Sequence, residues 1–204
     1  MRKNLQATEQ QHTLAHHSNS DAGDERARSE AVRESLARRL RSGDRSAAAE
    51  LVDRYYDRIY LFMRAVGHDR QLSEDLTQET FLRAWYHIGQ LRDGKALNGW
   101  LYRIAGNVSR LYWRKHRKED LISIDDIDLP AAGVSEPQKA EEHEQFVRVR
   151  KAVTRLPWKL KQAVALHYIE DLTISEAAEA AGVRQGTFKS RLNRALNALR
   201  KNVG

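Results

Sequence analysis

The residues best suited to catalysis or metal binding in this sequence do not form a recognisable site. His12, His16 and His17 have the spacing of metal ligands on a helix, but they lie in a polar stretch that is better interpreted as a tail. The segment 167–171 places a histidine beside two acids, but it directly precedes a helix-capping motif and is better explained by turn chemistry. The absence of cysteine excludes disulfides, thiol nucleophiles and cysteine zinc sites. No phosphate-binding glycine-rich loop is found either, so we expect no enzyme activity, no metal and no cofactor.

A basic and aromatic segment, in contrast, has the composition of a nucleic-acid-binding helix. From Trp100 to Lys118 there are six basic residues, four aromatic residues and no acid. Basic side chains bind phosphates and aromatic rings stack on unpaired bases, so this helix suits opened DNA strands. Alternatively the aromatic residues are core, which we expect for Trp100 and Tyr112, while Trp113 is expected at the surface. The preceding polar loop, 87–98, could accept a flipped base. The candidate residues are Asn98, Arg103, Asn107, Arg110, Trp113, Arg114 and Arg117.

The C-terminal part of the chain has the pattern of a helix-turn-helix. Thr173 and Glu176 form a capping box, an alanine-rich helix follows over 175–181, and Gly182 with Val183 supplies the turn. A second helix is predicted from about 185 to 199, and 184–204 holds six basic residues and no acid. In such a motif the start of the second helix enters the major groove. The alternative is a small helical hairpin with a solvated basic face. The candidate DNA-binding residues are Arg184, Gln185, Thr187, Lys189, Ser190, Arg191 and Arg194.

A third candidate surface lies on the segment 73–85, which reads as the start of an amphipathic helix. Acids near its beginning would interact favourably with the positive end of the helix dipole. Asp75 and Glu79 could either face solvent or dock this helix on a basic protein surface.

The elements that carry these residues are predicted to be helices throughout. No proline occurs before Pro130, and apolar residues recur at helical spacing in stripes that run from Leu51 to Val66 and from Leu97 to Tyr112. No segment alternates as a half-buried strand would. Glycine-containing breaks at 43–44, 67–69 and 89–94 separate the helices.

The distribution of charge divides the chain. Residues 119–145 contain nine acids and one base, a net charge of −8, whereas the whole chain of 204 residues carries +7, so the remainder carries +15 (7 plus 8). We interpret the acidic segment as a linker, with a solvated spacer as the simplest role. The expected organisation is a disordered extension over 1–28, a helical domain over 29–118, an acidic flexible linker over 119–143 and a second helical domain over 144–204. No apolar run is long enough to span a membrane and no secretory signal is evident, so we expect a cytoplasmic protein without membrane insertion.

Three motifs in order resemble the sigma-70 family of RNA polymerase sigma factors, in its compact extracytoplasmic-function group. The segment 75–81 resembles the helix that docks on the coiled coil of the largest polymerase subunit. The segment 100–105, followed by Asn107, resembles the helix that recognises and melts the −10 element. The segments 156–157, 167–172 and 186–192 resemble the domain that binds the −35 element, with Phe188 where the family usually has valine. That position is expected to face inward, so the change suggests local repacking.

The resemblance implies an all-α protein of two small helical domains that directs promoter-specific initiation and assists DNA melting. It implies three partners: core RNA polymerase, promoter DNA and an anti-sigma factor. It also implies that the acidic linker threads the nucleic-acid channel of the polymerase, where negative charge would stand in for a phosphate backbone. The residues it assigns to polymerase binding are Asp75, Leu76, Thr77, Gln78, Glu79 and Phe81. The competing interpretation is a helix-turn-helix regulator that binds duplex DNA without polymerase, which leaves the first two motifs unused.

Overall fold

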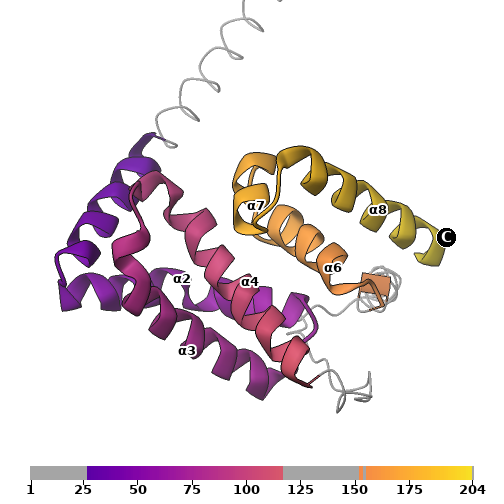
Figure 1. The fold of residues 1–204 in the computed structure, drawn as a ribbon, viewed down its shortest axis with the longest axis horizontal. Helices are drawn as coiled ribbons and strands as arrows, with labels where there is room; N and C mark the ends of the chain where they lie inside the picture. The colour runs from indigo at the N-terminus through magenta and orange to yellow at the C-terminus, as the bar shows by residue number, and fades with distance from the viewer. Residues whose placement is uncertain (1–26, 117–151, 154, 204) are drawn as a thin grey trace, which may run out of the picture.

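The computed structural model describes residues 27–116, 152–153 and 155–203, and every regular element in these ranges is a helix (Figure 1). This confirms the all-α prediction. The predicted linker 119–143 and the extension 1–28, apart from residues 27 and 28, lie outside the described residues. The elements are a helix over 27–41, α2 (Arg45–Ala65), α3 (Arg70–His87), η1 (Ile88–Gln90), η2 (Gly94–Ala96), α4 (Leu97–His116), α6 (Trp158–Val164), η4 (Ala165–Ile169), α7 (Ile174–Ala180) and α8 (Gln185–Val203).

The first group of helices packs α2, α3 and α4 around the predicted apolar stripes. Most stripe residues are buried, among them Leu51, Ile59 and Leu101. Val52 and Leu111 are exceptions and remain exposed, because each lies at the edge of its stripe. The predicted breaks are confirmed, with Gly43 and Gly67 both at positive φ.

Helix α3 begins earlier than the sequence suggested. Asp69 caps it by accepting a hydrogen bond from the backbone N–H of Leu72 at 2.8 Å, so the helix starts at Arg70. Glu74 and Asp75 therefore lie beyond the first turn. The expectation that acids in the first turn interact with the helix dipole was wrong.

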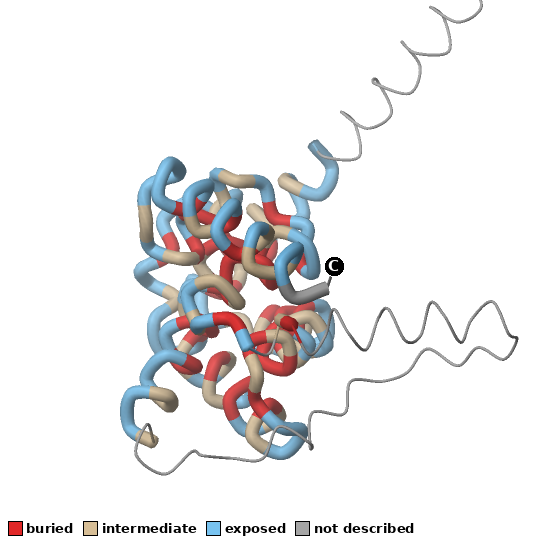
Figure 2. The backbone as a smooth tube through the Cα atoms, turned by 90° about the vertical axis from the view of Figure 1, so that its right-hand side faces the viewer, coloured by how far each residue is buried: buried red, intermediate tan, exposed pale blue. Residues whose placement is uncertain are grey.

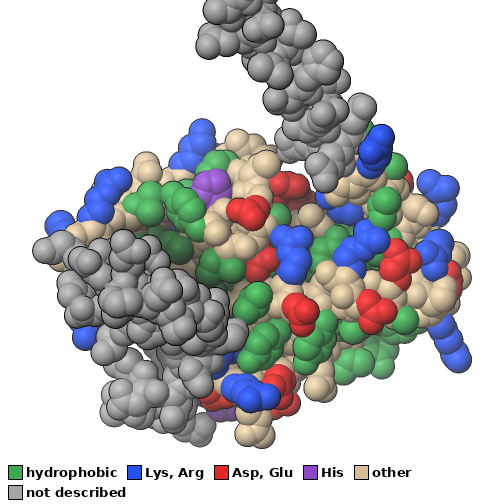
Figure 3. Space-filling view, turned by 180° about the vertical axis from the view of Figure 1, so that it is seen from behind, with side chains coloured by type: hydrophobic (Ala, Val, Ile, Leu, Met, Phe, Trp, Pro, Cys, Tyr) green, Lys and Arg blue, Asp and Glu red, His purple; other side chains and the backbone are tan. Residues whose placement is uncertain are grey.

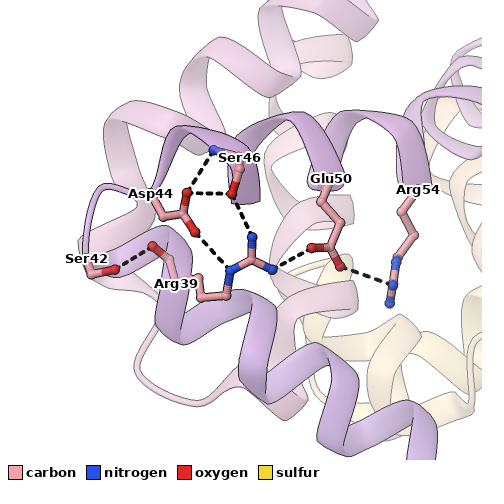
Figure 4. Close-up of polar contacts among 6 residues, drawn as sticks. All are labelled: Arg39, Ser42, Asp44, Ser46, Glu50 and Arg54. Carbon is pink, nitrogen blue, oxygen red and sulfur yellow. Dashed lines mark hydrogen bonds and ion pairs between the residues drawn. The ribbon is translucent and has the colours of Figure 1, made fainter.

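A charged cluster fixes the helix over 27–41 against α2 (Figure 4). The Arg39 guanidinium contacts the carboxylates of Asp44 at 2.9 Å and Glu50 at 2.7 Å. Asp44 also caps α2 through the backbone N–H of Ser46, and its hydrogen bonds to Ser46 and Arg39 lower its pKa to about 2. The cluster links two helices that contribute to one wall of an apolar groove.

The second group of helices contains the predicted helix-turn-helix. The Thr173 hydroxyl accepts from the Glu176 N–H, and the Glu176 carboxylate accepts from the Thr173 N–H, which confirms the capping box. Gly182 has a φ of +64°, as the turn requires. Phe188 is fully buried, so the inward orientation expected for it is confirmed.

The two groups of helices pack directly on each other through α4 (Figure 1). Helix α7 lies along one side of α4, and α2 and α3 lie against it elsewhere. Close approach depends on small residues: a Cβ at Gly106 would lie 2.6 Å from Gln162 Nε2, and one at Gly99 would lie 3.5 Å from the Glu176 carbonyl oxygen. Buried residues of both groups form one connected core, and Figure 2 shows buried segments in both.

A buried histidine occupies the point where α2, α4 and α6 meet. His68 is 1% exposed, and its Nε2 lies 2.8 Å from the hydroxyl of Ser109, which also accepts a hydrogen bond from the Trp158 indole. Its ring stacks on Trp113 with centroids 5.2 Å apart. Burial lowers the pKa of His68 to about 4. The imidazole is therefore neutral in the folded protein at physiological pH.

This depressed pKa predicts an acid-sensitive contribution to stability. Below pH 6.5 His68 becomes protonated in the unfolded chain, whereas in the folded chain it stays neutral until about pH 4. The contribution of His68 to folding stability is therefore complete above pH 6.5 and is lost as the pH falls towards 4. The loss attributable to His68 is about 2 kcal/mol between pH 7.5 and 5. Urea unfolding of the wild type and His68→Gln at both pH values measures it, and the variant should lose less. His87→Gln, at an exposed histidine, serves as control; equal losses in wild type and His68→Gln would contradict the prediction.

Candidate functional site

An apolar groove lies between α3, α2 and the helix over 27–41. It has a volume of about 380 Å³. Its outer wall leaves large apolar side chains in solvent, with Leu82 56% and Trp85 38% exposed. Figure 3 shows one face of the molecule on which hydrophobic side chains reach the surface in groups between charged ones. An open apolar surface of this kind is typical of sites that bind other macromolecules. The lining residues are Leu40, Ala48, Leu51, Val52, Tyr56, Gln78, Phe81, Leu82, Ala84, Trp85 and Ile88.

The predicted docking residues on α3 divide between this groove and the core. Asp75 and Gln78 are exposed, and Phe81 is half-buried and stacks on Tyr56 in the groove. Glu79 is half-buried and forms an ion pair with Arg83 at 2.6 Å.

Two of the predicted docking residues do not reach the surface. Leu76 and Thr77 are buried, and the Thr77 hydroxyl donates to the Ser73 carbonyl at 2.7 Å, so both support the helix from inside. The sequence analysis missed Leu82 and Trp85, although their spacing of one helical turn from Gln78 and Phe81 could have identified them.

Helix α4 gathers part of the predicted basic–aromatic set on one exposed face. Arg103, Asn107, Arg110 and Arg114 are spaced by four, three and four residues, and all are exposed. Arg110 donates to the Asn107 side-chain oxygen at 3.0 Å. The three guanidinium groups form a stripe on α4, a helix without acidic residues, and this stripe suits a phosphate backbone.

The other members of that set lie elsewhere. Asn98 is buried and its side-chain oxygen accepts a hydrogen bond from the Tyr55 hydroxyl, so it does not face solvent. Trp113, expected at the surface, is half-buried against His68, because its helical position points towards the second group of helices. Arg117 lies outside the described residues.

The start of α8 presents nearly all of its predicted residues to solvent. Phe188, Leu192 and Ala195 are buried on the inner face, which turns the polar residues between them outward. Gln185 donates to the Ser175 hydroxyl at 3.1 Å and so ties the second helix of the motif to the first. Of the seven predicted residues, Arg191 is half-buried. The other six are exposed: Arg184, Gln185, Thr187, Lys189, Ser190 and Arg194.

One acid has a role that the sequence analysis missed. Glu170 is 2% exposed, and its carboxylate accepts a hydrogen bond from the Tyr102 hydroxyl and contacts the Arg58 guanidinium at 3.2 Å. Arg58 also donates to the Glu170 carbonyl at 2.9 Å. Burial raises the pKa of Glu170, while Tyr102 and Arg58 oppose that rise. The turn interpretation holds for His167, which contacts the Leu172 carbonyl, but not for Glu170.

In the described ranges, no group of three or more histidine, cysteine or acidic residues is placed to hold a metal ion. None of the helices in those ranges combines the length and apolar character needed to cross a membrane.

Two family models match the chain, each over one group of helices. The model described as Sigma-70 region 2 matches residues 51–119, and that described as Sigma-70, region 4 matches residues 146–199. The chain is 30% identical over 176 residues to the ECF RNA polymerase sigma factor SigW of Bacillus subtilis (strain 168), covering 81% of this chain and 94% of that one. It is 34% identical over 152 residues to the ECF RNA polymerase sigma factor SigM of the same organism, covering 74% and 91%.

Solved structures share the fold. CnrH, in complex with the cytosolic domain of CnrY, matches with a TM-score of 0.61 and 22% identity, over 82% of this chain and 94% of that one. The sigma factor RpoE from Bartonella quintana, in complex with the anti-sigma factor NepR, matches with a TM-score of 0.59 and 24% identity, over 76% and 95%.

The burial of Asn98 predicts a structural rather than a DNA-binding role. Asn98→Ala would leave the Tyr55 hydroxyl buried without an acceptor, which costs about 1–3 kcal/mol of folding stability. Urea unfolding measures this loss. Asn107→Ala, at an exposed position of the same helix, should change stability by less than about 0.5 kcal/mol. An Asn98→Ala protein of wild-type stability would mean that this side chain is not held as described.

Proposed function

Because the chain belongs to the extracytoplasmic-function group of the sigma-70 family, we propose that it binds core RNA polymerase and directs initiation at promoters with −35 and −10 elements. A role in transcription initiation comes with that membership; the division of labour among its surfaces is the proposal. The observation that carries it is that an open apolar groove and two exposed basic helix faces coexist on one chain. The proposed function requires no catalytic residue, metal or cofactor.

The groove beside α3 is the proposed docking site for the coiled coil of the largest polymerase subunit. A helix of such a partner would lay apolar side chains between Phe81, Leu82 and Trp85, as amphipathic helices do in hydrophobic grooves. Asp75 and Gln78 are exposed on the same helix, where they would contact polar groups on the partner. This arrangement favours a sigma factor over a regulator that acts without polymerase, which would have no use for the groove.

The exposed stripe on α4 is proposed to hold the −10 region. Arg103, Arg110 and Arg114 supply positive charge along one face, and Asn107 can donate to and accept from a base edge. Trp113 is not available for stacking in this structure, since it packs on His68.

The start of α8 is proposed to enter the major groove of the −35 element. Its outward residues include one glutamine, hydroxyl groups and basic side chains, which together can bind bases and phosphates. We propose an anti-sigma factor as a further partner, as the family resemblance implies. The hypothesis that the acidic linker 119–143 lies in the polymerase channel stays a prediction.

Polymerase docking is tested by truncating the groove. Trp85→Ala and Leu82→Ala should each weaken binding to core polymerase by about 2 kcal/mol or more, because exposed apolar anchors dominate such interfaces. A binding titration with purified core polymerase measures the loss, and circular dichroism checks the fold. Leu61→Ala is the control, at a leucine of α2 that lies outside the groove and is about as exposed as Trp85. Docking elsewhere would be indicated if the control weakened binding and Trp85→Ala did not.

The −35 assignment gives different expectations for two arginines of α8. Arg191→Ala should cost about 1–3 kcal/mol and relax preference at one base pair, as expected for an arginine paired with guanine. Arg194→Ala should weaken binding to all DNA sequences alike, and it should reduce the slope of log affinity against log salt concentration by about one unit, as expected for a phosphate contact. Binding to a library of −35 duplexes at several salt concentrations distinguishes them. The opposite pattern would place the helix about one turn away from the proposed register.

A further inference from the structure

We propose that Glu170 is a latch between the two groups of helices, which holds the free chain in a closed form that cannot bind both promoter elements at once. The consequence for promoters rests on the function proposed above; the latch itself rests on the contacts described here.

The latch is a buried polar contact contributed by three segments far apart in the sequence. The Glu170 carboxylate comes from the turn before α7, the Tyr102 hydroxyl from α4, and the Arg58 guanidinium from α2. Glu170 and Tyr102 are almost completely buried, whereas the side chain of Arg58 is 43% exposed. No metal or ligand is needed to complete the contact, because each buried polar atom in it already has a partner.

Part of the remaining interface is formed by small and polar groups, beside the apolar residues of both groups that meet in the connected core. On the face of α4 that carries Tyr102, Gly99 approaches α7 and Gly106 approaches Gln162. One turn further along, Ser109 accepts a hydrogen bond from Trp158. These small and polar groups can become hydrated when the two groups of helices separate, as expected between domains that move relative to each other.

The buried polar atoms make the closed form sensitive to single changes. In an open form water solvates Glu170 and Tyr102, whereas in the closed form the Tyr102 hydroxyl depends on Glu170, and the Glu170 carboxylate depends on Tyr102 and Arg58. Removing one partner therefore leaves an unsatisfied buried group in the closed form only, and shifts the equilibrium towards the open form. Arg58 matters less, because its exposed part keeps contact with solvent.

The closed form is too small to span a promoter. Helix α7 packs on α4 and also on α8, as Figure 1 shows, and two successive packings of about 8–10 Å between axes place α8 within roughly 20 Å of α4. Elements near −35 and −10 are about 25 base pairs apart, or about 85 Å at 3.4 Å per base pair. The two reading helices must therefore separate before both elements are bound. The chain between residues 116 and 152 is long enough, since each residue can add up to about 3.3–3.6 Å.

The latch is tested by measuring the distance between the two groups of helices in the full chain. The protein has no native cysteine, so Gln71→Cys and Asn197→Cys, both at exposed positions, allow two spin labels to be placed and their distance measured by pulsed electron resonance. The labelled chain without a further substitution, which is the parent pair, should give one narrow, short distance. Glu170→Ala and Tyr102→Phe should each give longer, broader distances with unchanged helical content. Asp171→Asn is the matched control: it removes an exposed neighbouring charge and keeps a residue suited to the φ of +51°.

A double variant separates a latch from general damage. Tyr102→Phe combined with Glu170→Met removes both buried polar partners, so the short distance should return. The proposal is wrong if the parent pair already shows a broad distribution, if either single variant keeps the short distance, or if the double variant stays as open as the single ones.

The promoter consequence has its own measurement. A forked DNA carrying both elements should bind Glu170→Ala at least about tenfold more tightly than a −35 duplex alone, because two linked sites then engage together. The parent chain should bind the two probes about equally. If the distances respond as expected but the variant also binds both probes equally, the latch stands and the proposed assignment of promoter elements fails.

Discussion

Helix α4 lies against three different surroundings, and its repeat of 3.6 residues determines which side chains point towards each of them. Leu101, Ala105 and Val108 face the core formed with α2 and α3. Tyr102 and Gly106 face the second group of helices. The basic stripe is left to face solvent. Because each side chain lies on only one of these faces, a single substitution on α4 should affect stability, closure or DNA binding, but not all three.

Buried polar pairs contribute to the orientation of this helix in addition to its apolar contacts. Its N-terminal turn is tied to α2 through Asn98 and Tyr55, its middle to Glu170 through Tyr102, and its C-terminal half to His68 through Ser109. Apolar contacts tolerate small rotations, but a buried hydrogen bond requires one geometry. The helix is thereby held in a single rotation, which keeps the basic stripe outward.

The apolar groove beside α3, proposed as a docking surface, has a cost in stability. Exposing Trp85 and Leu82 forgoes burial that would otherwise stabilise the fold, and it risks association between copies. The wall of the groove is supported by the buried residues Leu36 and Leu40 and, at its surface, by the Arg39 cluster (Figure 4).

The sequence by itself determined the features that depend on neighbours within a few residues. The capping box at Thr173, the turn at Gly182 and the inward face of α8 follow from local geometry and helical periodicity, and the structure has them as predicted. The surface motifs were located from the sequence as well, although which of their residues reach solvent was not. Only the tertiary structure decided the roles of Asn98, His68 and Glu170, whose hydrogen-bond partners lie 43, 41 and 68 residues away. An acid or an amide has the same local pattern whether it faces water or a distant hydroxyl, because its burial depends on how helices far apart in the chain come together.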